Sequence, residues 1–140
     1  MPRQFLADTN LLSEPLRRQP SRSVMAWLAG RSDGEIVASI ISVGEMLRGA
    51  YLLATRDPAR MTRILAWIAD VETANEILDV DRRVIEAWAR LRVAYPGQAS
   101  TEDALIAATA VAHRLVVVTR NGSDFTPFGV PVHDPWTASP

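Results

Sequence analysis

Four acidic residues each stand within a few residues of a place where a predicted strand ends or a predicted helix begins. They are Asp8, Glu45, Asp103 and Asp124. Converging carboxylates repel one another unless a proton or a cation neutralises them, and hard divalent cations such as Mg²⁺ and Mn²⁺ take oxygen ligands. The four acids are therefore candidate ligands of such a cation.

Each acid also has a purely structural explanation. Asp8 suits a helix N-cap, and Asp103 complements the dipole at a helix start. Ser42 followed three residues later by Glu45 has the form of a capping box, and Glu45 is one turn from Arg48. The fourth acid fits an ordinary loop. The structural explanation predicts no common location for the four residues, whereas a metal site requires one.

Apolar and β-branched runs predict the strands, and apolar residues at helical spacing predict the helices that position these acids. Predicted strands lie at 4–7, in the first half of 35–41, and at 76–80, 115–119 and 130–132. Predicted helices lie at about 10–17, 24–28, 42–54, 58–68, 84–95 and 101–112, the last of them buried all round. Alternating strands and helices imply an α/β fold with a central, mostly parallel sheet flanked by helices. The third and fourth helices should form a helical hairpin.

Three of the four acids lie just beyond the C-terminal end of a predicted strand. In an open parallel α/β sheet this edge is where ligand sites form. The fold therefore provides a reason for the four carboxylates to converge on one crevice.

Composition limits the possible chemistry. The 140 residues suit one domain spanning 1–140, with about 136–140 forming a loose tail. The absence of cysteine excludes disulfides, thiolate zinc sites and cysteine nucleophiles, and all 15 basic residues are arginine, which excludes lysine chemistry and the P-loop. A net charge of −1 gives no global attraction to nucleic acid. With no signal region or apolar run of membrane-spanning length, we expect a soluble, cytoplasmic protein and no membrane partner.

Four blocks of sequence, in order along nearly the whole chain, resemble PIN-domain proteins and, more narrowly, VapC-type ribonuclease toxins of type II toxin–antitoxin systems. The blocks are Phe5–Asn10, Ile41–Gly49, Glu102–Ala110 and Thr119–Phe125. The resemblance implies a PIN-like fold and a Mg²⁺- or Mn²⁺-dependent endoribonuclease whose metal-binding and catalytic residues are the four acids. It also implies an RNA substrate, a cognate antitoxin, a homodimer and larger toxin–antitoxin assemblies.

Several neighbouring polar residues are candidates for supporting roles. Asn10, Thr119 and Asn121 can orient carboxylates, water or phosphate, and each fits a turn or cap equally well. Glu102 adjoins Asp103, but successive helical side chains point about 100° apart, so one of the two faces the pocket, and the family block favours Asp103. The candidate phosphate-binding arginines nearest to the site in sequence are Arg48 and Arg120, whereas His113 and His133 and the four tryptophans are interpreted as structural.

Two other functions remain open. The first is a PIN-like module that binds a partner protein without cleaving anything, which the complete acidic set makes the weaker interpretation. The second is a small-molecule phosphohydrolase with an aspartate nucleophile, which ranks last because such enzymes usually need a paired aspartate and a lysine, and the chain has no lysine.

Overall fold

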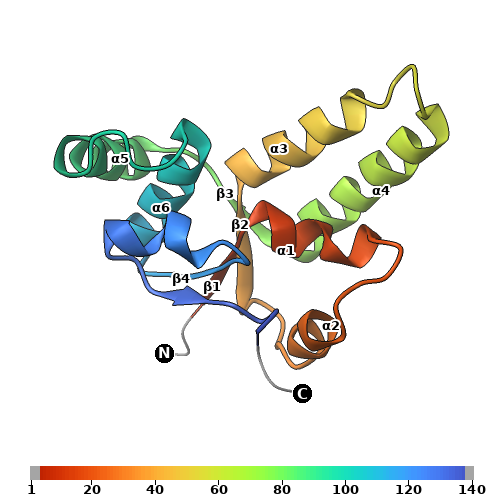
Figure 1. Ribbon diagram of the computed structural model, residues 1–140, viewed down its shortest axis with the longest axis horizontal. Helices are drawn as coiled ribbons and strands as arrows, with labels where there is room; N and C mark the ends of the chain where they lie inside the picture. The colour runs from red at the N-terminus through yellow and green to blue at the C-terminus, as the bar shows by residue number, and fades with distance from the viewer. Residues whose placement is uncertain (1–3, 138–140) are drawn as a thin grey trace.

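The computed structural model describes residues 4–137 and contains a five-stranded sheet with helices on both faces (Figure 1). The strands are β1 Phe5–Ala7, β2 Ile36–Ser39, β3 Glu76–Leu78, β4 Val116–Val118 and β5 Val132–His133. All neighbouring strands are parallel, in the order β3-β2-β1-β4-β5. The predicted α/β fold with a central parallel sheet is confirmed. The last strand begins two residues later than the predicted run at 130–132.

Within residues 4–137, six α-helices and three short 3-10 helices connect the strands. The α-helices are α1 Thr9–Ser13, α2 Arg22–Ala29, α3 Ile40–Tyr51, α4 Pro58–Ala74, α5 Arg82–Ala94 and α6 Thr101–His113. The 3-10 helices are η1 Glu14–Leu16, η2 Gly122–Asp124 and η3 Thr126–Phe128. Helices α3 and α4 lie side by side as the predicted hairpin (Figure 1). Asp57 opens α4 because its side chain accepts a hydrogen bond from the Arg60 N–H and Pro58 fills the first helical position.

Alternate strand residues divide the core into two halves, because successive strand side chains point to opposite faces of the sheet. Leu6 and Val117 pack toward α6, together with Phe125. Ala7 and Val118, one residue further along the same strands, pack instead with α1, α2, α3 and α4. Helices α5 and α6 therefore cover one face, and the other four cover the opposite face (Figure 1).

Small residues allow α6 to lie close to the sheet. Ala104, Ala107 and Ala108 are completely buried, and the Thr109 hydroxyl donates to the Leu105 carbonyl within the helix. The prediction that this helix is buried on every side is wrong in part, because most of its apolar residues are buried but Val111 is 44% exposed. The close approach of α6 places its first turn, with Asp103, at the same end of the sheet as the start of α3 (Figure 1).

The strand order places a topological switch point beside β1. The chain runs from β1 outward through β2 to β3, and then returns to the other side of β1 as β4. Connections that leave in opposite directions open a crevice beyond the carboxyl ends of the two strands, where α/β proteins bind ligands. Asp8 directly follows β1, and Thr119 directly follows β4. The sequence predicted this edge but not which strands would be neighbours.

The predicted capping box at Ser42 is wrong. Helix α3 begins at Ile40, and Ser39 is its N-cap, accepting a hydrogen bond from the Ile41 N–H at 3.0 Å. Ile40 and Ile41 are β-branched and apolar, so their local pattern resembles a continuation of the strand. Ser42 is completely buried inside the first turn, and Glu45 consequently lies in the second turn rather than the first.

The end of the described chain packs against the sheet layer. Trp136 is partly buried against the half of the core that contains Ala7 and Val118, and its backbone N–H donates to the Asp134 carboxylate at 2.8 Å. The rest of the predicted tail, 138–140, lies outside the described residues. Over 4–137, every helix is too short or too polar to cross a lipid bilayer.

Candidate metal centre

Asp8 is both a helix cap and the buried centre of the acidic cluster. Its Oδ1 accepts from the Thr9 N–H at 2.8 Å, which caps α1, while its Oδ2 accepts from the Thr119 hydroxyl at 2.8 Å. Only 6% of Asp8 is exposed. Capping and a place in the shared site are therefore compatible, because the two carboxylate oxygens have different partners.

Thr119 connects the two strands that border the switch point. It is completely buried, donates to Asp8, and accepts a hydrogen bond from the Asn121 backbone N–H at 3.0 Å. The bond from Thr119 limits the orientation of the Asp8 carboxylate. Asn121 acts here through its backbone, and Asn10 lies exposed on α1 without a side-chain hydrogen bond to any described residue.

Glu45 reaches the cluster from α3 and is held there by a residue that the sequence analysis did not select. The Thr9 hydroxyl donates to Glu45 Oε1 at 2.7 Å, and the Thr9 backbone N–H donates to Asp8. One threonine thus links the acids that follow β1 and β2. Its position directly after Asp8 was the only sequence signal for this role. Arg48, the structural partner considered for Glu45, is exposed and forms no ion pair with any residue in 4–137.

The pKa shifts of Asp8, Glu45 and Asp103 have one another's charges, or that of Asp124, among their causes. Burial raises the pKa of Asp103 to about 6, and the negative charges of Asp8, Asp124 and Glu45 add to the rise. Burial also raises the pKa of Asp8, where the hydrogen bonds from Thr119 and Thr9 oppose the rise and the charge of Asp124 adds to it. The structure thus brings together carboxylates that are 116 residues apart in the chain.

The pKa of Glu45 is raised by burial and by its acidic neighbours. The hydrogen bond from Thr9 opposes the rise, whereas the charges of Asp8 and Glu102 add to it. Glu102 itself is exposed on the first turn of α6. It therefore lies at the rim of the cluster, while Asp103 interacts with the other three acids.

The cluster contains negative charge that no arginine among the described residues neutralises through an ion pair. Among residues 4–137, the ion pairs involve Glu14, Glu35 and Glu86, and none involves the four acids. Among the described residues, no three acidic or histidine side chains are placed as a ready-made set of metal ligands. The negative charges of these carboxylates repel one another, and a divalent cation bound between them would remove that repulsion. Carboxylate oxygens are also the donors that hard divalent cations prefer. The donor chemistry therefore fits Mg²⁺ or Mn²⁺.

Removing one charge from the cluster should stabilise the metal-free protein. The pKa of Asp103 is higher in the folded state than in the unfolded chain, so its favourable contribution exists at low pH and is lost as pH rises through about 6. With allowance for solvent screening, the ionised group costs about 1–2 kcal/mol. We expect Asp103→Asn to raise the melting temperature in EDTA at pH 8 by roughly 3–8 °C.

The difference between Asp103→Asn and wild type should shrink at pH 5, where Asp103 in the wild type carries a proton. Asp33→Asn is a matched control, because Asp33 is exposed in the turn before β2. Differential scanning fluorimetry at both pH values measures the effect. An equal gain from both variants, or a gain that is unchanged at pH 5, would contradict the repulsion described here.

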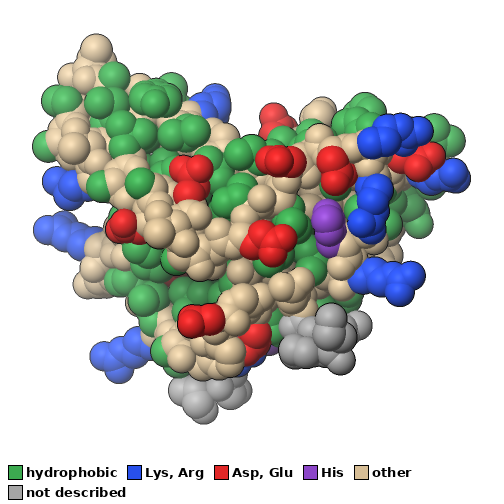
Figure 2. Space-filling view, turned by 180° about the vertical axis from the view of Figure 1, so that it is seen from behind, with side chains coloured by type: hydrophobic (Ala, Val, Ile, Leu, Met, Phe, Trp, Pro, Cys, Tyr) green, Lys and Arg blue, Asp and Glu red, His purple; other side chains and the backbone are tan. Residues whose placement is uncertain are grey.

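The other polar and aromatic candidates have structural surroundings. His133 lies in β5 rather than in a terminal loop, with its ring centroid 5.5 Å from that of Trp27. Trp67 donates from its indole N–H to the Leu12 carbonyl at 2.9 Å, and Trp88 packs against the core beside α6. The face shown in Figure 2 carries its arginines toward the two sides with acidic side chains between them, so no continuous basic surface covers it.

Comparison with known proteins identifies PIN-domain relatives that match almost the whole chain. The PIN domain family model matches residues 5–127. The Toxin FitB of Neisseria gonorrhoeae is 35% identical over 137 residues, covering 94% of this chain and 98% of the relative. VapC ribonuclease Y4jK of Sinorhizobium fredii is 31% identical, covering 94% of this chain and 97% of the relative.

A solved structure has the same architecture. The crystal structure of FitAcB from Neisseria gonorrhoeae superposes with a TM-score of 0.84 at 32% identity, covering 96% of this chain and 100% of that chain. The chain belongs to the PIN-domain family.

Proposed function

We propose that this protein is a Mg²⁺- or Mn²⁺-dependent endoribonuclease that acts as the toxin of a toxin–antitoxin pair. The observation that supports this most is the convergence of Asp8, Glu45, Asp103 and Asp124 at the switch point, with no arginine paired to them among the described residues. One PIN-domain relative is named a ribonuclease and another a toxin.

The four acids would hold the metal, which supplies an activated water and charge neutralisation at the scissile phosphate. Thr119 keeps Oδ2 of Asp8 in a fixed orientation, and Thr9 does the same for Oε1 of Glu45. These two hydroxyls limit the rotation of the carboxylates and so lower the cost of ordering them around a cation. The buried position of Asp8 also keeps bulk water from screening its charge.

Metal removal tests this proposal directly. The purified chain should cleave single-stranded RNA in Mg²⁺ or Mn²⁺, lose the activity in excess EDTA, and recover it when metal is added back. Analysis of the RNA ends after expression would identify the substrate. A preparation that is folded by circular dichroism and cuts no RNA in either metal would instead support the non-cleaving binding module.

The same proposal includes a cognate antitoxin, a homodimer and a cytoplasmic location, where the RNA substrate would be met. The four sequence blocks resemble toxins that are held inactive by an antitoxin. Expression of the chain alone should therefore arrest bacterial growth, and co-expression of the protein encoded beside it should relieve the arrest. Growth that is unaffected by expression of a soluble product would contradict the toxin role.

A further inference from the structure

A pocket of about 530 Å³ lies between α1 and the end of the described chain, and none of the four acids lines it. Its lining includes Arg17, Arg120, Asn10, Asn121 and Trp136. Arg120 and Asn121 directly follow Thr119, the residue that donates to Asp8. The pocket therefore begins within two residues of the network that orients the central carboxylate.

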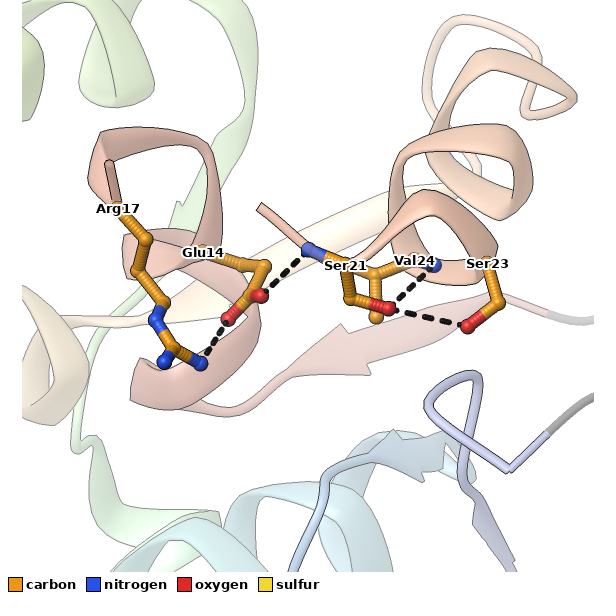
Figure 3. Close-up of polar contacts among 5 residues, drawn as sticks. All are labelled: Glu14, Arg17, Ser21, Ser23 and Val24. Atoms are coloured by element: carbon orange, nitrogen blue, oxygen red, sulfur yellow. Dashed lines mark hydrogen bonds and ion pairs between the residues drawn. The ribbon is translucent and has the colours of Figure 1, made fainter. Parts of the chain in front are cut away.

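A buried carboxylate fixes one arginine at this pocket. Glu14 is 3% exposed, and its Oε2 lies 3.6 Å from Nη1 of Arg17, whose own side chain is 56% exposed (Figure 3). Oε1 of Glu14 accepts a hydrogen bond from the Ser21 N–H at 2.9 Å. A buried acid held at both oxygens therefore positions Arg17 while more than half of the arginine side chain stays exposed.

The same network continues to the aromatic wall of the pocket. The hydroxyls of Ser21 and Ser23 lie 3.0 Å apart (Figure 3), and Ser23 donates to the Trp136 carbonyl at 3.4 Å. The indole Nε1 of Trp136 is buried without an acceptor among residues 4–137, although the residue is partly exposed. The indole nitrogen is therefore not part of the exposed surface of Trp136. The exposed side-chain surface is hydrocarbon, which suits stacking on a base.

Arg120 completes the charge of the pocket. It is exposed and forms no ion pair with any described residue. Arginine forks match phosphate oxygens, and unpaired bases of single-stranded RNA stack on aromatic side chains. A second groove of 490 Å³ between α3 and α4 reaches Glu45 and shares Arg17 with this pocket. It has arginines at 56, 60 and 63, but it has no aromatic side chain, and apolar side chains such as Leu53 and Ile64 line much of it.

We propose that this pocket binds a nucleotide of the RNA adjacent to the scissile phosphate, with Arg17 and Arg120 contacting phosphates and Trp136 stacking on a base. This inference rests on the proposed ribonuclease function. The pocket combines two exposed arginine side chains with an aromatic surface, and its residues Arg120 and Asn121 directly follow Thr119, which donates to Asp8. Such a pairing suits single-stranded nucleic acid better than an apolar helix.

Binding rather than cleavage should be measured. A fluorescein-labelled ten-nucleotide RNA of mixed sequence is titrated with protein by fluorescence anisotropy, using the Asp8→Asn background in EDTA so that the RNA remains intact. Adding Arg17→Ala and Arg120→Ala together should weaken binding by about tenfold or more and reduce the slope of log Kd against log salt by roughly 1.4, the value for two contacts to a single strand.

Trp136 provides a second, independent readout. Trp136→Ala should weaken binding by about fivefold or more with little change in the salt slope, and Trp136→Phe should restore most of the affinity. Arg82→Ala with Arg90→Ala is the matched control, because both arginines are exposed on α5 and pair only with Glu86 there. That control should leave both affinity and salt slope close to the parent values.

Several outcomes would overturn the inference. One is an unchanged affinity and salt slope in the Arg17 and Arg120 double variant, and another is an equal loss in the α5 control. Because Arg17 lines both sites, Arg120→Ala alone is compared with Arg56→Ala plus Arg60→Ala; a greater loss from the latter would direct the RNA to the α3–α4 groove instead. Loss of only protein-partner binding would make the pocket a protein interface. Failure of the proposed function is recognised separately, because the wild-type chain would then cleave no RNA in Mg²⁺ or Mn²⁺.

Discussion

Asp8→Asn is expected to leave the fold intact and to reduce metal-dependent RNA cleavage by more than about 100-fold, since losing a group that merely supports a metal ligand already costs about 10- to 100-fold. The substitution preserves the size of a residue that is only 6% exposed. Its amide oxygen can still accept from the Thr9 N–H, and the Thr119 hydroxyl can turn to accept from the new amide nitrogen. What is lost is the negative charge at the centre of the cluster.

Initial rates of RNA cleavage in saturating Mg²⁺ measure this effect, and circular dichroism checks the fold. Thr119→Val is an informative second variant, because it removes the hydrogen bond to Oδ2 while keeping the carboxylate. We expect an intermediate loss of about 10- to 100-fold. Asp33→Asn should retain full activity. Wild-type rates in the Asp8→Asn protein would remove Asp8 from the active site.

The order and type of most elements were predictable because they depend on local patterns. The run 115–119 is β-branched and apolar, and the apolar residues of α4 recur at helical spacing after a strong Asp57-Pro58 start. Register between strands was not predictable, since the pairing of Ala7 with both Ala38 and Val118 depends on contacts that are remote in sequence. The start of α3 was mispredicted because β-branched Ile40 and Ile41 fit a strand locally.

The edge of the sheet that carries the candidate site could be predicted from the sequence, but the hydrogen bonds between the residues at that edge could not. Asp8 and Thr119 were placed at strand ends, yet the bond between them requires β1 and β4 to be neighbours, which only the folded chain establishes. Thr9 was missed for the same reason, since its partner Glu45 is 36 residues away. Local propensity cannot encode such contacts.

Phe125→Ala is expected to destabilise the protein by about 3–5 kcal/mol, as for other buried phenylalanines, and to lower its melting temperature by roughly 10–20 °C. Phe125 is 1% exposed and packs with Leu6 and Val117 in the half of the core beside α6. Because this ring is buried, it anchors the loop that carries Asp124. The Phe125 N–H also donates to the Gly122 carbonyl within that loop, at 3.0 Å. Urea unfolding followed by circular dichroism measures the loss.

Val93→Ala is the matched control, because Val93 is 84% exposed on α5 and its truncation should change stability by no more than about 0.5 kcal/mol. A similar unfolding midpoint for Phe125→Ala and Val93→Ala would show that Phe125 does not anchor the core. The anchoring also predicts a functional consequence. Asp124 sits in η2 between a strand that is fixed and a ring that is buried, so a loosened loop would lose its carboxylate from the cluster. At temperatures where Phe125→Ala remains folded, its RNA cleavage should therefore fall further than its folded fraction, whereas that of Val93→Ala should not.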